Sequence, residues 1–247
     1  MIRILTLIVF FSILGSIGAV IAAGLFLLFK KRIQTILVSC LIAYATGTLL
    51  AVALLVMIPK AISQSDPSII MSFFLGGIIF FFLLEKIIIW HHCRVETCEV
   101  HSAAGPIILI GDAFHNLIDG IVIAASFLIS IPLGIIISFS VLTHEIPQEI
   151  GDFGILLQNQ YSKRKAFLLN LLSSSTTIPA AILGYYILDI VSSTIPFIIA
   201  ISAASFVYIA LSDLTPDLHR NVGLGYGIRQ IILILAGIGI IVLIILM

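Results

Sequence analysis

Two short stretches of the sequence carry nine side chains that could bind a metal ion or a proton. The first stretch, residues 111–120, contributes Asp112, His115, Asn116 and Asp119. The second stretch, residues 144–152, contributes His144, Glu145, Gln148, Glu149 and Asp152. At about 100° per residue, the polar positions of each stretch fall on one side of an α-helix. Each stretch therefore predicts a helix with one polar face, and neither contains a Lys or Arg that could neutralise its acids.

The spacing within each stretch suits chelation of a divalent transition metal. His115 and Asp119 are four residues apart, as are His144 and Gln148, so each pair can hold one ion from a single helix face. Asn116 and Glu145, which follow the two histidines, could hold a second ion beside the first, with a carboxylate bridging the two ions. Imidazole combined with carboxylate and amide ligands favours Zn, Fe, Mn, Co or Ni over Ca or Mg, which prefer oxygen.

The composition indicates that these polar faces belong to a membrane protein. Of 247 residues, 61% are hydrophobic and 10% are charged, and the mean hydropathy is +1.28. An ordinary soluble domain has about 25% charged and about 45–50% apolar residues. The 12 basic and 12 acidic residues leave no net charge, which excludes nucleic acid as a partner. We therefore expect an integral membrane protein without a water-soluble domain.

Eight apolar ranges are each long enough to cross a bilayer as a helix. They are residues 4–29, 35–58, 69–90, 105–129, 132–157, 166–188, 195–214 and 228–247. We expect an all-α fold in which residues 1–247 form one transmembrane domain. Strands are not expected, because membrane strands are about ten residues long and alternate strictly. The first range is too long for the apolar core of a secretory signal, so we expect it to remain as a span.

The fourth and fifth ranges contain the two polar stretches, where burial of the acids is costly. An ionised residue at the centre of a spanning helix costs roughly 2.5–3.5 kcal/mol, so the five carboxylates would approach about 12–18 kcal/mol. That cost is as large as the whole stability of a domain, about 5–15 kcal/mol. We therefore expect the two polar faces to lie against each other in the interior. We also expect protons or metal cations to neutralise their carboxylates.

The distribution of basic residues predicts the orientation in the membrane. Ten of the 12 Lys and Arg residues fall on one side of the predicted spans, which we assign to the cytoplasm. Arg3 and Lys60 remain for the other side, so both termini are expected outside a cell membrane that the chain crosses several times. Pro59 and Pro216 occupy similar positions near the ends of the second and seventh ranges. Such a pattern suggests an inverted repeat of helices 1–3 and 6–8 around a central pair.

The two polar stretches resemble the signatures of the ZIP (Zrt/Irt-like) family of divalent metal transporters. Residues 115–120, His-Asn-Leu-Ile-Asp-Gly, are similar to the family's HNxxDG motif, and residues 144–149, His-Glu-Ile-Pro-Gln-Glu, to its HExPHE motif. The similarity extends to Gly151 and Asp152 and, more weakly, to Gly47, Pro59, Glu85, Tyr208, Asp213 and Pro216. Gln148 stands where many members have His. The form with Gln at this position is similar to prokaryotic-type members. The resemblance implies import of Zn²⁺ or of a related ion such as Cd²⁺, Fe²⁺ or Mn²⁺.

The resemblance also implies a binuclear metal site halfway across the membrane. Matched position by position, the first metal position consists of His115, Asp119, His144 and Gln148. The second consists of Asn116, Asp119, Glu145 and Gln148, with Asn170 of the sixth range assisting. Because Gln is a neutral and weaker ligand than His, position 148 bears on the strength of the second site and on the choice of metal.

Further polar residues predict a path for the ion toward the cytoplasm. Antiparallel pairing of the two polar helices would place Asp112 level with Glu149 and Asp152, so that carboxylates descend from the central site. The alternative for Asp112 and Asp152 is capping and pairing near helix ends. The connection 91–101 holds three His and two Cys, which fits either a loose capture site for metal or a plain polar loop.

Two other functions stay open from the sequence. An intramembrane metallohydrolase could use His144 and Glu145 in an HExxH-like site, although Gln148 replaces the second histidine. A proton channel, or a proton-coupled carrier of an organic solute, would need the acids but not both histidines. We expect a transporter and not an enzyme, with divalent metal ions and the lipid bilayer as partners and a homodimer as a candidate assembly.

Overall fold

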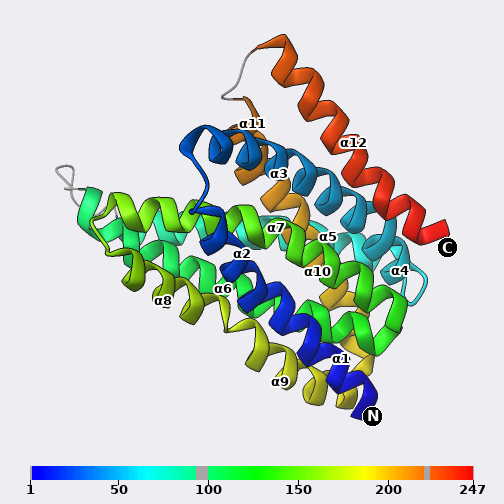
Figure 1. Cartoon of the computed structure of the whole chain (residues 1–247). Coiled ribbons are helices and arrows are strands. Elements are labelled where there is room, and N and C mark those ends of the chain that lie inside the picture. Colours follow the sequence, from blue (N-terminus) through cyan, green and yellow to red (C-terminus); the bar gives the residue numbers. More distant parts are fainter. Residues whose placement is uncertain (1, 93–99, 220–222, 247) are drawn as a thin grey trace.

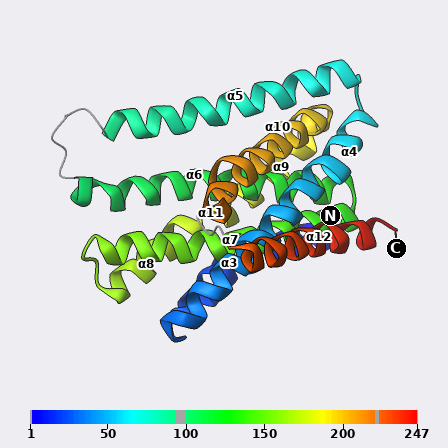
Figure 2. The same ribbon diagram turned by 90° about the horizontal axis from the view of Figure 1, so that it is seen from above.

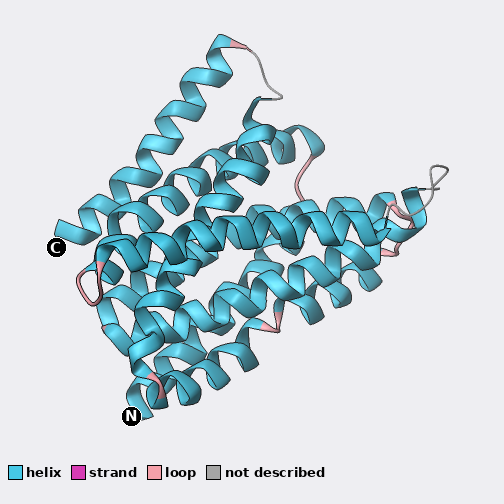
Figure 3. Ribbon diagram, turned by 180° about the vertical axis from the view of Figure 1, so that it is seen from behind, coloured by secondary structure: helices cyan, strands magenta, loops and turns pink. Residues whose placement is uncertain are grey.

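The computed structural model describes residues 2–92, 100–219 and 223–246, which fold into helices joined by short connections (Figure 1). Figure 3 shows no strand among these described residues. Seven segments are long and apolar enough to cross a membrane. They are Arg3–Phe26, Ile36–Ile62, Pro67–Ile87, Leu109–Ile129, Lys163–Leu188, Ser192–Ser212 and Leu224–Leu246. The predicted all-α, multi-pass membrane fold is confirmed.

The fifth predicted range corresponds to α7 (Ile131–Gln158), which is not one of the seven segments. Its 28 residues exceed the about 20 that a span requires. The second polar stretch fills its C-terminal half and lowers its hydropathy. Ser130 begins the helix, because its hydroxyl accepts a hydrogen bond from the backbone nitrogen of Leu133. The connection from α6 (Val100–Ile129) is this single residue, so the two helices run antiparallel.

Several spans contain an irregular turn. The π-helical turn Leu14–Gly18 lies between α1 (Ile2–Ile13) and α2 (Ala19–Phe26). The turn Val52–Met57 lies between α3 (Lys31–Ala51) and α4 (Ile58–Ile62). The turn Ile209–Leu214 lies between α10 (Ile195–Tyr208) and α11 (Thr215–His219). A break of two residues separates α8 (Lys163–Ser174) from α9 (Thr177–Ile190), whereas α5 (Pro67–His92) and α12 (Leu224–Leu246) are continuous. π-helical turns are often found at functional sites.

The helices pack in two groups around the polar pair. In one group, α6 lies against α7, α8 and α9, with α1 and α2 along α7. In the other, α3 packs on α12 and α5 packs on α10. Figure 1 shows α12 at one edge of the molecule, and Figure 2 shows α5 at another edge. The contact of α3 with α7 joins the groups and includes a 3.1 Å hydrogen bond between the hydroxyls of Thr48 and Thr143.

Glycines allow the closest helix crossings in both groups. A Cβ atom at Gly120 of α6 would lie 2.3 Å from the carbonyl oxygen of Thr177 at the start of α9. A Cβ atom at Gly47 of α3 would lie 2.2 Å from the carbonyl oxygen of Ile234 in α12. Small residues at such crossings let helix backbones approach closely within a membrane. The backbone of α6 is thereby held against the break between α8 and α9.

Candidate metal centre

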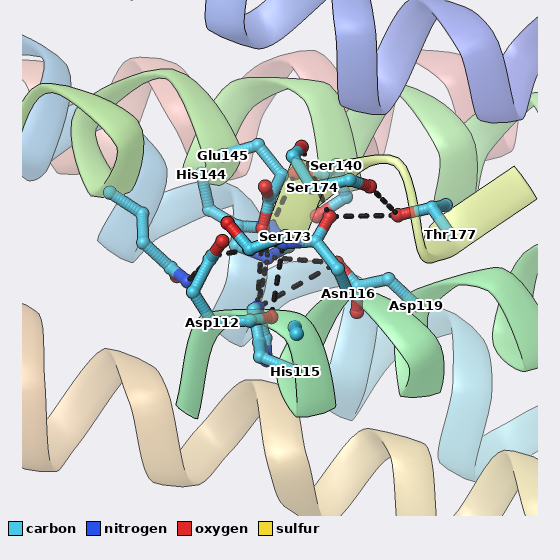
Figure 4. A network of polar contacts seen from close by, with 12 residues as sticks. Asp112, His115, Asn116, Asp119, Ser140, His144, Glu145, Ser173, Ser174 and Thr177 are labelled. Atoms are coloured by element: carbon cyan, nitrogen blue, oxygen red, sulfur yellow. Dashed lines mark hydrogen bonds and ion pairs between the residues drawn. The ribbon is translucent and has the colours of Figure 1, made fainter. Parts of the chain in front are cut away.

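The polar faces of α6 and α7 meet in the interior, as predicted (Figure 4). His115 and Asp119 of α6 and His144 and Glu145 of α7 each offer one ligand atom, and these four atoms all lie within 4.8 Å of one another. The side chains of Asp119, His144 and Glu145 are buried, and that of His115 is 13% exposed. These four residues define what we call the histidine group.

The histidine group brings two imidazoles and two carboxylates close together, with one hydrogen-bond contact among them, between the imidazoles. The Nε2 atoms of His115 and His144 are 3.1 Å apart. The imidazole-to-carboxylate distances in the group are 3.3–3.7 Å, longer than the usual 2.7–3.2 Å of an N–H···O hydrogen bond. No carboxylate oxygen of Asp119 or Glu145 has a hydrogen-bond partner. Two imidazoles and two carboxylates around one point are a ligand set that suits tetrahedral zinc.

The ring of His144 is held in an orientation that exposes one nitrogen to the group. Its Nδ1 lies 2.9 Å from the carbonyl oxygen of Ser140, which can only accept a hydrogen bond. Donation from Nδ1 to this carbonyl leaves Nε2 as the nitrogen that faces the group, which is the usual arrangement of a metal-binding histidine. Phe206 of α10 packs against the ring, with the centroids 5.4 Å apart. Ser140 precedes His144 by one helical turn and could have been recognised from the sequence, whereas no local pattern pointed to Phe206.

A second group of acids lies beside the first. Asp112, Glu145 and Glu149 each offer a carboxylate oxygen, and these three atoms also lie within 4.8 Å of one another. This proximity agrees with the expectation that antiparallel helices place Asp112 level with Glu149. The amide of Gln148 donates a 3.1 Å hydrogen bond to Asp112 Oδ1. Asp152 is also buried, and its Oδ2 has no hydrogen-bond partner.

Asn116 is engaged in hydrogen bonds to three helices. Its Oδ1 accepts a 2.7 Å bond from Thr177 and a 3.3 Å bond from Ser174, and its Nδ2 donates a 2.9 Å bond to Asp112 Oδ1. Coordination of a metal through this oxygen would require a hydroxyl to move away. Asn170 of α8 donates a 3.4 Å bond to the carbonyl oxygen of Glu149, and its own buried Oδ1 has no hydrogen-bond partner. The hydroxyls at the α8–α9 break were not predicted from the sequence, because their role depends on tertiary packing.

Comparison with known sequences identifies the family. The family described as "ZIP Zinc transporter" matches residues 90–245, more than half of the chain and all of both polar stretches. The chain belongs to the ZIP family. The metal-capture site predicted for the connection 91–101 lies outside the residues whose side chains the structure describes.

Individual ZIP relatives match roughly half of this chain. "Zinc transporter zipt-7.2" of Caenorhabditis elegans is 35% identical over 136 residues, which are 53% of this chain and 29% of the relative. "Zinc transporter ZIP10" of Danio rerio is 33% identical over 144 residues, 56% of this chain and 17% of the relative. "Zinc transporter foi" of Drosophila melanogaster is 36% identical over 149 residues, 59% of this chain and 21% of the relative. The aligned part thus spans less than a third of the length of each of these relatives.

Proposed function

We propose that this ZIP-family protein moves Zn²⁺ across the membrane toward the cytoplasm. The observation that carries the proposal is the histidine group, in which two Nε2 atoms lie 3.1 Å apart beside two buried carboxylates without hydrogen bonds. Its relatives are named zinc transporters, which supports zinc as the transported ion. Cd²⁺, Fe²⁺ and Mn²⁺ are further substrates in this proposal, because the same mixed nitrogen and oxygen ligands bind them.

The proposed path follows the polar face of α7. The histidine group binds the ion first, and Gln148 provides a neutral side chain one turn further along the helix. Glu149, Asp152 and Asp112 then receive the ion on its way inward. Their burial and free oxygens support this role. Transport requires binding strong enough to load the ion and weak enough to release it, which a neutral Gln at position 148 favours.

The proposed topology has eight spans in one transmembrane domain, with α7 as the eighth, and both termini outside. An inverted repeat is supported by matching segmentation of two spans. Val52–Met57 and Ile209–Leu214 are six-residue π-helical turns, and each precedes a five-residue helix with Pro at its second position. The contacts are also reciprocal, because the first turn packs on α10 and the second packs on α3.

The exposed apolar faces of α5 and α12 are available to lipid or to a second copy in a homodimer.

The metallohydrolase alternative is less well supported. The histidine group uses four protein ligands, whereas catalytic zinc usually has three and an open position for water. The named relatives are transporters. Both observations favour a transported ion over an ion that stays bound for chemistry.

Uptake of zinc by proteoliposomes tests the proposal. The full chain is reconstituted, and zinc entry is compared for the wild type, His115→Ala and Ser72→Ala on an exposed part of α5. His115→Ala should lose most zinc flux while eluting as a folded protein, and Ser72→Ala should transport normally. Wild-type flux in His115→Ala, or no zinc flux in the wild type, would contradict the proposal.

A further inference from the structure

We propose that Arg229, near the start of α12, binds the phosphate of an anionic phospholipid at the membrane surface. The site lies where α12 packs on α3, at an edge of the molecule and outside the two helices that carry the metal centre (Figure 1). None of its residues belongs to the histidine group, so the inference goes beyond the proposed function and does not depend on it.

Arg229 is a charged residue within an apolar span. The segment Leu224–Leu246 is long and apolar enough to cross a membrane, and Arg229 is five residues from its start. At about 1.5 Å per residue, that distance is about 8 Å along a helix about 35 Å long. The hydrocarbon core of a bilayer is about 30 Å thick, so Arg229 lies close to the level of the headgroups. An ionisable residue in a span is costly unless it has a partner, which makes it a candidate functional residue.

The guanidinium of Arg229 has few polar partners in the described part of the chain. Its hydrogen bond to this part runs from Nη2 to the Ser39 hydroxyl of α3 and is 3.4 Å long. Nε is buried and has no hydrogen-bond partner. The ion pairs of the described residues do not include Arg229. Since arginine has five N–H donors and a buried donor without an acceptor is costly, the group can bind an acceptor from outside the chain.

The surroundings of Arg229 suit a lipid headgroup with its acyl chains. The guanidinium lies over the ring of Tyr226, with Cζ 5.0 Å from the ring centroid, which supports a cation–π contact. Gly225 precedes Arg229 by one helical turn, and a Cβ added there would meet no atom within 4 Å. Gly227 is equally open. The apolar side chains that α12 exposes around this site are Leu224, Ile228, Ile231, Ile232 and Leu235.

Charge and apolar surface together favour an anionic phospholipid over a soluble anion. A guanidinium can bind two phosphate oxygens side by side, which a lysine cannot do. The acyl chains of a lipid can cover the exposed apolar residues of α12, whereas inorganic phosphate leaves them exposed. With both termini outside, as proposed, this end of α12 faces the cytoplasmic leaflet, where anionic lipids are found. Basic sites between spanning helices on that side are suited to lipid headgroups.

Titration of phosphatidylglycerol into the full chain in detergent, followed by native mass spectrometry, tests the inference. R229Q should bind the first lipid at least about fivefold more weakly than the wild type, the scale expected for one basic residue at an anionic membrane. R229K keeps the charge without the planar fork and should show an intermediate affinity. R164Q removes an exposed arginine at the start of α8 and should bind like the wild type. Excess inorganic phosphate should not displace the lipid.

S39A separates lipid binding from a structural role of Arg229. This variant loses the hydroxyl that contacts the guanidinium and should bind phosphatidylglycerol at least as tightly as the wild type. The inference is overturned if R229Q binds the lipid normally, if R164Q or S39A weakens binding as much as R229Q, or if inorganic phosphate displaces the lipid. His115→Ala should bind the lipid normally, so a failure of the proposed zinc transport would leave this inference standing.

Discussion

At the scale of single residues, the candidate metal centre depends on side chains that are held in place by hydrogen bonds to residues outside the histidine group. His144 is oriented through its Nδ1 by Ser140, and Asn116 is held by two hydroxyls at the α8–α9 break. The helix-face arithmetic predicted that the polar faces of α6 and α7 meet, although it placed Gln148 beside the histidines and the structure places its amide on Asp112. It could not predict Thr177 or Phe206, because both come from helices that only the tertiary fold brings to the site.

Gln148→His should raise the apparent affinity for zinc and lower the maximal uptake rate. The substitution adds a nitrogen ligand at a position whose present side chain donates to Asp112. Stronger binding aids loading and slows release. Uptake measured over a range of zinc concentrations gives both quantities, with Ser72→Ala as the control. If neither quantity changes, Gln148 is not in contact with the ion.

Thr177→Val should destabilise the protein by about 1–3 kcal/mol, since it removes the shorter of the two hydrogen bonds to the buried Asn116 Oδ1. Thermal unfolding in detergent measures the change. Thr194→Val, at an exposed hydroxyl in the same half of the chain, is the matched control and should have little effect. Equal stability of Thr177→Val and the wild type would show that the hydrogen bond contributes nothing.

Zinc affinity should fall when the medium on both sides of the membrane is acidified from about pH 7.5 to 5.5, the range in which imidazoles gain protons. Zinc ligands must be deprotonated to bind, so protons compete with the ion for imidazole ligands in general. Equal pH on both sides removes any proton gradient as a driving force. An affinity independent of pH across this range is incompatible with histidine ligation.

At the scale of helices, close crossings hold the two polar faces in register. The apolar ranges predicted from the sequence correspond well to the observed helices, because span length is imposed by bilayer thickness. The π-helical turns and the α8–α9 break were not predicted, since no residue pattern in those segments distinguishes them from regular helix. In α7, the polar residues of the candidate metal centre lower the hydropathy of the helix. For this reason α7 is not among the seven segments that are long and apolar enough to cross a membrane.

Gly120→Ala should destabilise the protein by about 1–3 kcal/mol, the usual cost of overpacking. Its new Cβ would clash with the backbone at Thr177, which cannot rotate away as a side chain can. Gly111→Ala on the same helix is the control, because no atom lies within 4 Å of its added Cβ. Thermal unfolding of both variants should show a lower midpoint only for Gly120→Ala. Similar midpoints would mean that the crossing is not tightly packed.

At the scale of the whole molecule, one chain surrounds a polar centre with apolar helices. The all-α membrane class was predictable from composition and from the length of the apolar ranges, and the pairing of the two polar helices from charge and spacing. How α3, α8 and α10 approach the centre was not, because helix–helix contacts in lipid are selected by shape and small residues more than by hydrophobicity. The matching turns after α3 and α10 favour the inverted repeat that the two prolines had suggested.

The central claim is that zinc binds between the two imidazoles, and X-ray absorption at the zinc edge tests it most directly. The purified full chain is loaded with one equivalent of zinc and its spectrum compared with that of His144→Ala. The account predicts two imidazole nitrogens with oxygen ligands, all at about 2.0–2.2 Å, and fewer imidazoles in the variant. A zinc ion bound by sulfur at about 2.3 Å, or a spectrum without imidazole scattering, would contradict it.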